Sequence, residues 1–313
     1  MPFGSWLIQW ISRPFRGFGD SKRKAYMDIL NSLEDTDKVM FVENGHGKKG
    51  LLVFRQKIKK SGTSVIYAGA SLMEPFPVVY KLVNKKYCDL LLKEYIIMRS
   101  VWHRNILHVR GIHFSLKGNV VIMRMDAAYN RDLYSYLRTT EGYVNKPVLD
   151  KWMKELVSAM CHVHSKGYVH GDLNYKNILL TKDLSIRVAD FGSADKKSKF
   201  KLTRYDPKFL PPELNSRRLE PIPAEYDTRL IDVWGVGVVL FFALTKHHPF
   251  TESITMSATD VHGNCPGETL LYDEDRRRCS SSYAKVVGKL MDYNAARRPK
   301  LCYIIRQDYF SET

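Results

Sequence analysis

One stretch of the chain, residues 162–192, limits what the chain can fold into more than any other part of the sequence. It reads HVHSKGYVHGDLNYKNILLTKDLSIRVADFG and carries Asp172, Asn177 and Asp190, each close to strongly apolar residues. Its segments NILLT and IRVAD have the β-branched and apolar composition of two short strands. These three polar residues therefore flank two predicted strands, and one chemistry must account for all of them.

The periodicity of the sequence changes once along the chain. Between about residues 38 and 84, runs of β-branched and aromatic residues alternate with turn signals, which predicts strands. Residues 86–102 have apolar positions on one helical face, and residues 119–125 form another short apolar run. From about residue 131 the apolar residues recur mainly at helical spacing. This order predicts a small β-rich lobe with one long helix, followed by a larger helical lobe.

The predicted boundaries are 1–44 for an N-terminal extension, 45–125 for the small lobe and 126–313 for the large lobe. Within the large lobe, residues 251–282 are polar and weakly periodic, which predicts an inserted loop. The extension has apolar residues at helical spacing within residues 3–18 and a second helical pattern at 20–34. The first of these segments is suited to pack on its own domain, to contact a membrane or a partner, or to stay disordered.

Charge and cysteine content narrow the class of protein. The chain has 49 Lys and Arg against 33 Asp and Glu, a formal net charge of +16, which predicts attraction to polyanions. The basic residues are spread along the chain, so an ordinary solvated surface is the competing interpretation. The 5 cysteines form no CxxC pair, which favours a reducing, intracellular compartment, either cytoplasm or nucleus. No apolar run approaches the roughly 18 residues that span a membrane.

Phosphoryl transfer from ATP needs the residue types that this chain offers. The polyphosphate requires a cation and Mg²⁺, the metal requires hard oxygen ligands, and the acceptor hydroxyl requires a carboxylate. Asp190 and Asn177 supply oxygen ligands, and Asp172 supplies the base. Lys81 supplies the cation, and Glu94, on the next predicted helix, can hold the lysine in place.

Taken in order, these residues resemble the motifs of the eukaryotic-type protein kinase family, and the match runs from about residue 51 to 305. The catalytic loop of that family, H-R-D-L-x-x-x-x-N, is matched by HGDL and by Asn177. The metal-binding triplet DFG is intact at residues 190–192. VVYK places the strand lysine of the family at Lys81, and the run EYIIMRSVWHRNIL places its helix glutamate at Glu94.

Further family motifs follow this site. PPE at residues 211–213 resembles A-P-E, DVWGVG from Asp232 resembles D-V-W-S-x-G, and HHPF and Arg298-Pro299 match later positions. The resemblance implies that Asp232 steadies the backbone of the catalytic loop, and that Glu213 and Arg298 form an ion pair. A single motif could arise by chance, but this many in the right order exclude coincidence.

The resemblance implies an α+β, bilobal protein-kinase-like fold, in which a small β-rich N-lobe with helix C precedes a larger helical C-lobe. It implies ATP and Mg²⁺ as cofactors and a protein as substrate. The implied catalytic residues are Asp172, Lys81 and Asn177, and the implied Mg²⁺ ligands are Asn177 and Asp190. The implied ATP-binding residues are Lys81, Glu94, Ser61, Gly62, Ser64, Ile66, Arg124 and Asp126, the last two through backbone groups that meet the adenine.

Three departures from the family pattern change these expectations. The glycine-rich loop G-x-G-x-x-G-x-V aligns with KKSGTSVI at residues 59–66, which has glycine at none of the three glycine positions. Glycine lets backbone N–H groups approach phosphate, so we expect weaker ATP binding. Gly171 replaces the arginine that clasps a phosphate on the activation loop, so we expect activity without phosphorylation of that loop. Asn174 stands where serine/threonine kinases usually have lysine, and Lys176 is the nearest source of that charge.

Several alternatives stay open at this point. The commonness of serine/threonine kinases favours Ser or Thr as acceptor, whereas PKFLPPE at residues 207–213 has a tyrosine-kinase character. The poor glycine loop fits a pseudokinase scaffold, although the complete set of catalytic residues argues against one. HGDL with its following Asn also resembles small-molecule phosphotransferases of the aminoglycoside-kinase type.

The expected partner is a protein substrate. The basic run DKKSKFKLTR at residues 195–204 either steers acidic sequences toward the site or stands in for the arginine that is missing at position 171. No specific nucleic-acid partner is predicted, and we expect a monomer. The compact chain and its divergent loops also resemble kinases of large DNA viruses, a likeness that no residue motif carries. A viral member of the family would act inside the host cell.

Overall fold

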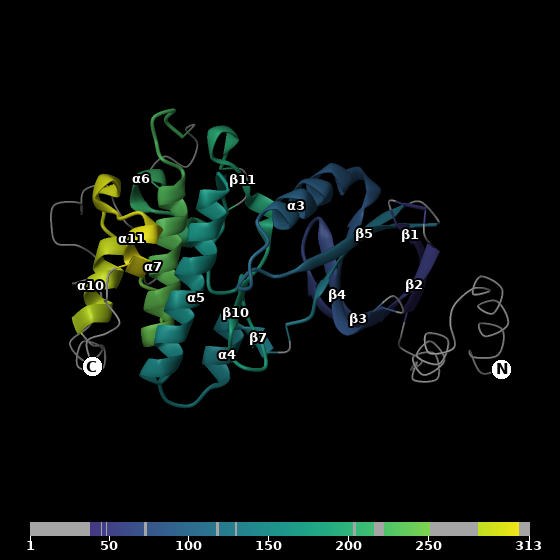
Figure 1. Cartoon of the computed structure of the whole chain (residues 1–313), viewed down its shortest axis with the longest axis horizontal. Coiled ribbons are helices and arrows are strands. Elements are labelled where there is room, and N and C mark those ends of the chain that lie inside the picture. Colours follow the sequence, from purple (N-terminus) through teal and green to yellow (C-terminus); the bar gives the residue numbers. More distant parts are fainter. Residues whose placement is uncertain are drawn as a thin grey trace. The chain divides into compact units, whose positions relative to one another are not determined.

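The computed structural model describes residues 38–44, 46–47, 49–71, 74–116, 119–128, 130–202, 205–215, 222–250 and 281–306. The predicted segments at 3–18 and 20–34, and the predicted insertion up to residue 280, lie outside the described residues. The chain divides into two compact units, which are coloured by sequence in Figure 1. The small unit holds the residues up to Tyr95 together with His108–Ala127, and the large unit holds Ile96–Leu107 together with the residues from Ala128 onward.

The small unit is a closed barrel of six antiparallel strands, in the order β1-β2-β3-β4-β6-β5. The strands are β1 (Lys38–Asn44), β2 (Lys49–Lys60), β3 (Ser64–Ser71), β4 (Glu74–Asn84), β5 (Val109–Ser115) and β6 (Val120–Asp126). Their Val, Ile, Phe and Tyr content fits the pleated, half-buried surface that such residues prefer.

The first strand closes the barrel because it pairs on both sides. Val42 lies opposite Gly50 on β2 and opposite Ser115 on β5. This strand is the one that the pattern KVMFVENG predicts, and it falls in the stretch 1–44 that the sequence analysis sets aside as an extension. The sheet of the small unit therefore begins at Lys38.

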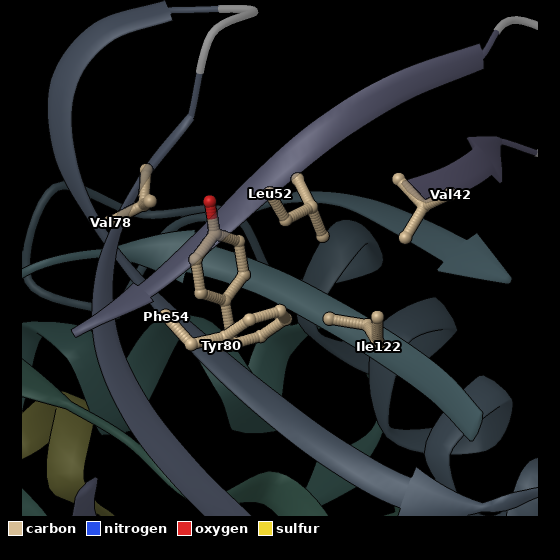
Figure 2. Packing of buried hydrophobic residues seen from close by; sticks show 6 residues of the cluster. All are labelled: Val42, Leu52, Phe54, Val78, Tyr80 and Ile122. Carbon is tan, nitrogen blue, oxygen red and sulfur yellow. The ribbon is translucent and has the colours of Figure 1, made fainter. Parts of the chain in front are cut away.

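Apolar side chains fill the inside of the barrel, as Figure 2 shows. The cluster consists of Val42, Leu52, Phe54, Val78, Tyr80 and Ile122, all nearly inaccessible to solvent. The rings of Phe54 and Tyr80 lie 4.9 Å apart, and the hydroxyl of Tyr80 donates to the carbonyl of Ala70 at 2.5 Å. Burial of each such side chain contributes roughly 1.5–3 kcal/mol, so this cluster is a main source of the barrel's stability.

One long helix follows the fourth strand. It is α3 (Cys88–Ser100), preceded by a 3-10 turn at Lys85–Tyr87 in which the side chain of Asn84 accepts the N–H of Lys86. Its buried residues, Leu91, Glu94, Ile97 and Met98, recur at the helical spacing that the sequence predicts. A buried Glu in this apolar row needs a partner, and β4 supplies it.

The large unit is mainly helical, with short strands near its start. Its helices are α4 (Leu133–Thr139), α5 (Lys146–Ser165), α6 (Pro212–Asn215), α7 (Arg229–Thr245), α10 (Ser281–Leu290) and α11 (Leu301–Arg306). Its strands are β7 (Asn130–Asp132), β8 (Tyr168–Val169), β9 (Ile178–Leu180), β10 (Ile186–Val188) and β11 (Asp195–Lys196). Strands β10, β9 and β7 form one sheet, and β11 pairs with β8.

The core of the large unit is built around α7, which lies against α5 and α10. Almost every residue of α7 from Ile231 to Ala243 is buried, as expected for a helix that is apolar on all sides. The helix α5 starts at a cap in which Asn145 accepts the N–H of Val148, and it buries one face. The α+β, two-lobed class predicted from the sequence is confirmed.

Within the described ranges, no helix combines the length and the apolar character needed to cross a membrane.

Candidate active site

Lys81 and Glu94 form a close ion pair inside the small unit. The ammonium of Lys81, on β4, is 2.8 Å from each carboxylate oxygen of Glu94, on α3. Their side chains are only 13% and 5% exposed. Buried charges are stable only when they are paired and hydrogen-bonded, so this contact fixes the position of the ammonium. The structure thus brings together the two residues that the sequence analysis pairs.

The turn at residues 61–63 joins β2 to β3 and holds the predicted phosphate-binding residues. The N–H of Ser61 donates to the carbonyl of Ser64 at 2.8 Å, and the N–H of Ser64 donates to the hydroxyl of Ser61 at 3.1 Å. These two amides are therefore bonded within the turn. A Cβ atom at Gly62 would meet nothing within 4 Å, so the conformation does not require glycine there. Ile66, on β3, lies opposite Lys81.

Arg124 and Asp126 are the two residues expected to meet adenine through their backbone, and the structure places both on β6. Arg124 lies within β6, paired with Tyr80 on β4 and with Gly111 on β5. The N–H of Asp126 donates to the carbonyl of His108 at 3.0 Å. The N–H of Asp126 that was expected to meet adenine is thus already bonded within the small unit, while the expectation for Arg124 stays a prediction.

The predicted base, Asp172, lies in the large unit between two asparagine side chains. Nδ2 of Asn177 donates to the backbone carbonyl of Asp172 at 2.8 Å and to its carboxylate at 3.2 Å. Nδ2 of Asn174 donates to the same two groups at 3.1 and 3.3 Å. Burial raises the pKa of Asp172 and the nearby charge of Asp190 raises it further, against the opposing effects of His170 and the two amides.

A buried carboxylate on α7 holds the backbone just before Asp172. Asp232 is 0% exposed and accepts the N–H groups of His170 and Gly171, both at 2.9 Å. It also contacts Nε2 of His164 at 2.8 Å. Gly235, one turn along α7, lets the catalytic loop approach, because a Cβ atom there would lie 2.8 Å from the carbonyl of Leu173.

Asp190 follows β10 in a strained backbone conformation. Its φ of 63° and ψ of 69° lie in the left-handed region, which non-glycine residues rarely adopt. The neighbouring residues are held by His170, whose Nε2 lies 3.1 Å from the carbonyl of Ala189. The ring of His170 also packs edge-on against Phe191, with 4.7 Å between ring centroids.

The oxygen atoms that Asn177 and Asp190 offer in the large unit are suited to bind a hard divalent cation. The amide N–H₂ of Asn177 is turned to Asp172, which leaves Oδ1 as the acceptor of that side chain. Asp190 lies close enough to Asp172 to raise its pKa, and a cation between carboxylates relieves such repulsion. Oxygen ligands of this kind suit Mg²⁺.

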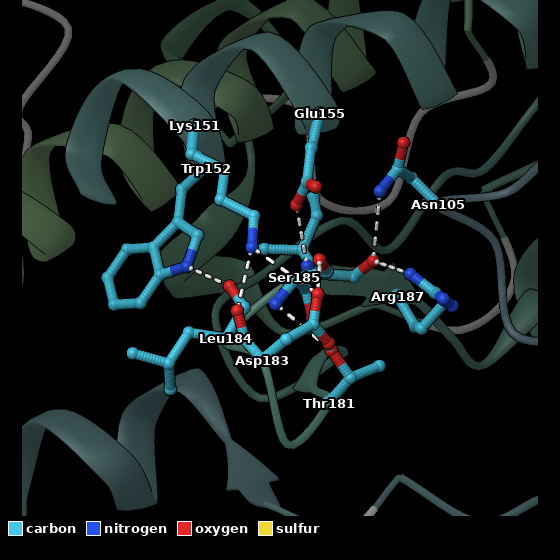
Figure 3. A network of polar contacts seen from close by, with 10 residues as sticks. Asn105, Lys151, Trp152, Glu155, Thr181, Asp183, Leu184, Ser185 and Arg187 are labelled. Atoms are coloured by element: carbon cyan, nitrogen blue, oxygen red, sulfur yellow. Dashed lines mark hydrogen bonds and ion pairs between the residues drawn. The ribbon is translucent and has the colours of Figure 1, made fainter. Parts of the chain in front are cut away.

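The hairpin between Asn177 and Asp190 is fastened to α5 by the polar network in Figure 3. Nε1 of Trp152 donates to the carbonyl of Leu184 at 2.7 Å, and the carboxylate of Glu155 accepts the N–H of Ile186 at 2.8 Å. Nδ2 of Asn105 donates to the carbonyl of Ile186 at 3.2 Å. Because both ends of the hairpin carry predicted metal ligands, this network helps to fix their separation.

A second ion pair forms as the motifs predict. Arg298 donates through NH1 and NH2 to the two carboxylate oxygens of Glu213, both at 2.7 Å. The hydroxyl of Tyr226 donates to the same carboxylate at 2.6 Å, and burial together with that negative charge raises the pKa of Tyr226 well above its usual range.

Some contributors to the site are absent from the sequence prediction. The amide of Asn174 reaches the carboxylate of Asp172, although only its departure from the family pattern singles it out in the sequence. The ammonium of Lys176 lies 5.4 Å from the ring centroid of Tyr134. His164 and Tyr226 have no motif that could have revealed their contacts with Asp232 and Glu213.

Comparisons with known proteins agree with this geometry. The family model described as "Protein kinase domain" matches residues 61–310. Serine/threonine-protein kinase PLK4 of Aedes aegypti is 27% identical over 267 residues, which cover 80% of this chain and 32% of that protein. Sperm motility kinase 2B of Mus musculus is 28% identical over 214 residues, 67% of this chain and 42% of that protein. CBL-interacting protein kinase 5 of Oryza sativa subsp. japonica is 28% identical over 203 residues, which cover 61% of this chain and 42% of that protein. The matched part thus spans well under half of each relative.

Proposed function

This chain belongs to the protein kinase family, and from that membership we propose that it transfers the γ-phosphate of ATP to a serine or threonine hydroxyl of a protein substrate. Relatives named serine/threonine-protein kinases support this choice of acceptor. The observation that carries the proposal is the hydrogen-bonded set of Asp172 and Asn177 beside Asp190.

In this proposal Asp172 orients the acceptor hydroxyl and takes its proton. Burial raises the pKa of this carboxyl, so its ionised form is a better base than a solvated carboxylate. The amides of Asn174 and Asn177 keep the carboxylate in one orientation. The buried carboxylate of Asp232 fixes the backbone that carries it.

The cofactors of this reaction are ATP and a divalent cation. Mg²⁺, when bound, neutralises negative charge on the polyphosphate. Asn177 and Asp190 would hold it, because they supply the oxygen ligands that this ion prefers. Lys81 offers a fixed ammonium to the phosphates, since Glu94 holds it at 2.8 Å through both oxygens.

The substrate class that the charges favour is an acidic protein sequence. Between Asp190 and Glu213, exposed lysines stand at positions 196, 197, 199, 201 and 208. A surface with one sign of charge attracts segments of the opposite sign and raises their association rate. We therefore include acidic residues near the acceptor hydroxyl in the proposal.

The test incubates the purified chain with Mg²⁺ and γ-labelled ATP, using casein as an acidic substrate and myelin basic protein as a basic one. Label should be transferred to casein, on serine or threonine, and Asp172→Ala and Lys81→Ala should each abolish it. The combined variant Lys199→Glu/Lys201→Glu should raise KM for casein and leave KM for ATP unchanged. Lys285→Glu/Lys289→Glu, an equal charge change at two exposed positions of α10, should leave both values unchanged.

A second candidate is a scaffold that uses the kinase fold without transferring phosphate. The amides of Ser61 and Ser64, bonded within their own turn, favour it, because those donors are not offered to a phosphate. Nucleotide binding with no label on any substrate, and no effect of Asp172→Ala, would select the scaffold and refute the kinase.

A further inference from the structure

The side chain of Phe200 lies directly on the residue before the predicted base. A Cβ atom at Gly171 would be 2.4 Å from Cε2 and 2.5 Å from Cζ of Phe200, far inside any normal contact. Gly171 also has a φ of 76°, in the region that favours glycine. The ring therefore occupies the space that any larger residue at position 171 would need.

Phe200 is itself held in a buried apolar cluster. It is 8% exposed and packs with Val169, Leu214 and Ile231. Its neighbours in the sequence, Lys199 and Lys201, are exposed, so the chain inserts one aromatic ring between two solvated lysines. Burial of a Phe side chain is among the stronger single anchors that a loop can have.

The segment that carries Phe200 is also tied to the catalytic loop by its backbone. Asp195 and Lys196 on β11 pair with Val169 and Tyr168 on β8. The N–H of Lys197 donates to the carbonyl of Gly167 at 2.8 Å. These contacts involve Gly167, Tyr168 and Val169, which lead into Gly171. The residues around Phe200 are therefore bonded to the start of the catalytic loop.

Gly171 is therefore held from two sides. Its N–H donates to the carboxylate of Asp232 at 2.9 Å, while the ring of Phe200 lies at its Cα. We propose that Phe200 is a positioning residue, which fixes the peptide of Gly171 and thereby the orientation of Asp172. The inference rests on the proposed kinase function, and it explains how the segment can be held in place without a phosphate on it.

The test compares steady-state kinetics of the wild type, Phe200→Ala and Phe200→Leu, with unfolding midpoints measured on the same samples. A displaced catalytic group can cost roughly 30- to 100-fold in rate, so Phe200→Ala should lower kcat by about that factor while KM for ATP changes less than about threefold. Phe200→Leu keeps an apolar anchor and should restore most of kcat. Equal kcat in wild type and Phe200→Ala would overturn the inference.

A double-mutant cycle separates positioning from simple stability. Gly171→Ala should be nearly inactive, because its methyl group collides with the ring of Phe200 and a φ of 76° also strains alanine. Phe200→Ala/Gly171→Ala should be more active than Gly171→Ala alone, since the ring that causes the collision is gone. Additive losses in the cycle would refute the inference.

The matched control is Leu214→Ala, which removes another member of the same cluster. It should lower the unfolding midpoint and should not rescue Gly171→Ala, because Phe200 and Ser193, not Leu214, supply the atoms nearest to a Cβ at position 171. Phosphatase treatment of the wild type should leave kcat unchanged. If the wild type transfers no phosphate at all, the proposed function fails; if it is active but the cycle is additive, only the inference about Phe200 fails.

Discussion

The carboxylate of Asp232 accepts the backbone N–H of Gly171 at 2.9 Å, although the two residues are 61 positions apart in the sequence. The same carboxylate accepts the N–H of His170 and contacts His164. A side chain that is 0% exposed thus meets three groups of the catalytic loop and of α5. Asp232 therefore ties the core helix α7 to the loop that carries the predicted base, Asp172.

Asp232→Asn should therefore lower both stability and activity. An amide has only one acceptor oxygen and would turn N–H₂ toward a backbone N–H, so we expect a loss of about 3 kcal/mol in the free energy of unfolding. Urea denaturation measures this change. Asp227→Asn, which loses a half-exposed pair with Arg229, should cost less than about 1 kcal/mol. Equal effects of the two substitutions would contradict the assigned role of Asp232.

Glu94→Gln should weaken the small unit, because the buried ammonium of Lys81 would lose the charged carboxylate that accepts from it at 2.8 Å. We expect a loss of about 2 kcal/mol and a lower kcat/KM for ATP. Lys81→Met/Glu94→Gln removes both charges and should be more stable than Glu94→Gln alone, although inactive. Denaturant unfolding of the four proteins in this cycle gives the coupling energy, and a coupling near zero would show that the pair does not contribute.

The buried side chain of His113 should make the stability of the protein depend on pH. It is 2% exposed, and burial followed by the charge of Arg124 lowers its pKa to about 4 from 6.5. Because the pKa of His113 is lower in the folded state, the folded protein binds fewer protons than the unfolded protein at a pH between the two pKa values. The free energy of unfolding therefore falls as the pH drops from 6.5 toward 4. The full difference of about 2.5 pKa units corresponds to about 3 kcal/mol.

His113→Phe should remove this contribution. Relative to the wild type, the variant should gain stability steadily between pH 6.5 and pH 4, as measured by urea unfolding at several pH values. A constant difference across this range would show that His113 does not titrate as its burial requires.

Asp172→Asn should show the opposite dependence. Its folded pKa is raised, first by burial and then by Asp190, so the folded state binds more protons than the unfolded state above the unfolded pKa of about 3.9. Wild-type stability then falls as pH rises from that value through the raised pKa. The inactive variant should become more stable than the wild type as pH rises through this window. Thermal unfolding at pH 3.5 and pH 7 tests the sign, and a gain confined to pH 3.5 would be incompatible with it.

The turn at 61–63 predicts modest ATP affinity that one substitution can raise. Ser61→Gly removes the hydroxyl that accepts the N–H of Ser64 at 3.1 Å, which frees this donor for a phosphate oxygen. We expect the Kd for a fluorescent ATP analogue to fall about threefold, the equivalent of one modest hydrogen bond. Thr63→Gly is the control, because it adds the same backbone freedom to the turn without freeing the N–H of Ser64. It should not lower the Kd.

Much of the site was predictable because its residues belong to motifs whose order is fixed. The pairs Lys81–Glu94 and Glu213–Arg298 form as expected. Lys81 and Glu94 each lie in an apolar stretch, where burial demands an opposite charge, whereas the pairing of Glu213 with Arg298 was implied only by the resemblance to the family. The order of strands and helices was predictable for a similar reason, since periodicities of two and of 3.6 residues mark them directly.

The remaining contacts depend on how distant segments meet, which no local pattern encodes. Nothing near Phe200 in the sequence reveals that its ring lies on Gly171. The hydrogen bond from the N–H of Asp126 to the carbonyl of His108 was not foreseen, because the end of a strand depends on its partner. The role of β1 was missed because a strand pattern does not tell which neighbours the strand will find.

The ring of strands in the small unit also affects how other polypeptides can meet it. β1 pairs with β2 over Lys38–Glu43 and with β5 over Val42–Asn44, so the hydrogen-bonding groups of β2 and β5 that face β1 are matched and offer no template for a foreign strand. Loss of β1 would expose β2 and β5 together and create two such templates at once. The seven residues Lys38–Asn44 therefore protect against templated self-association as well as completing a fold.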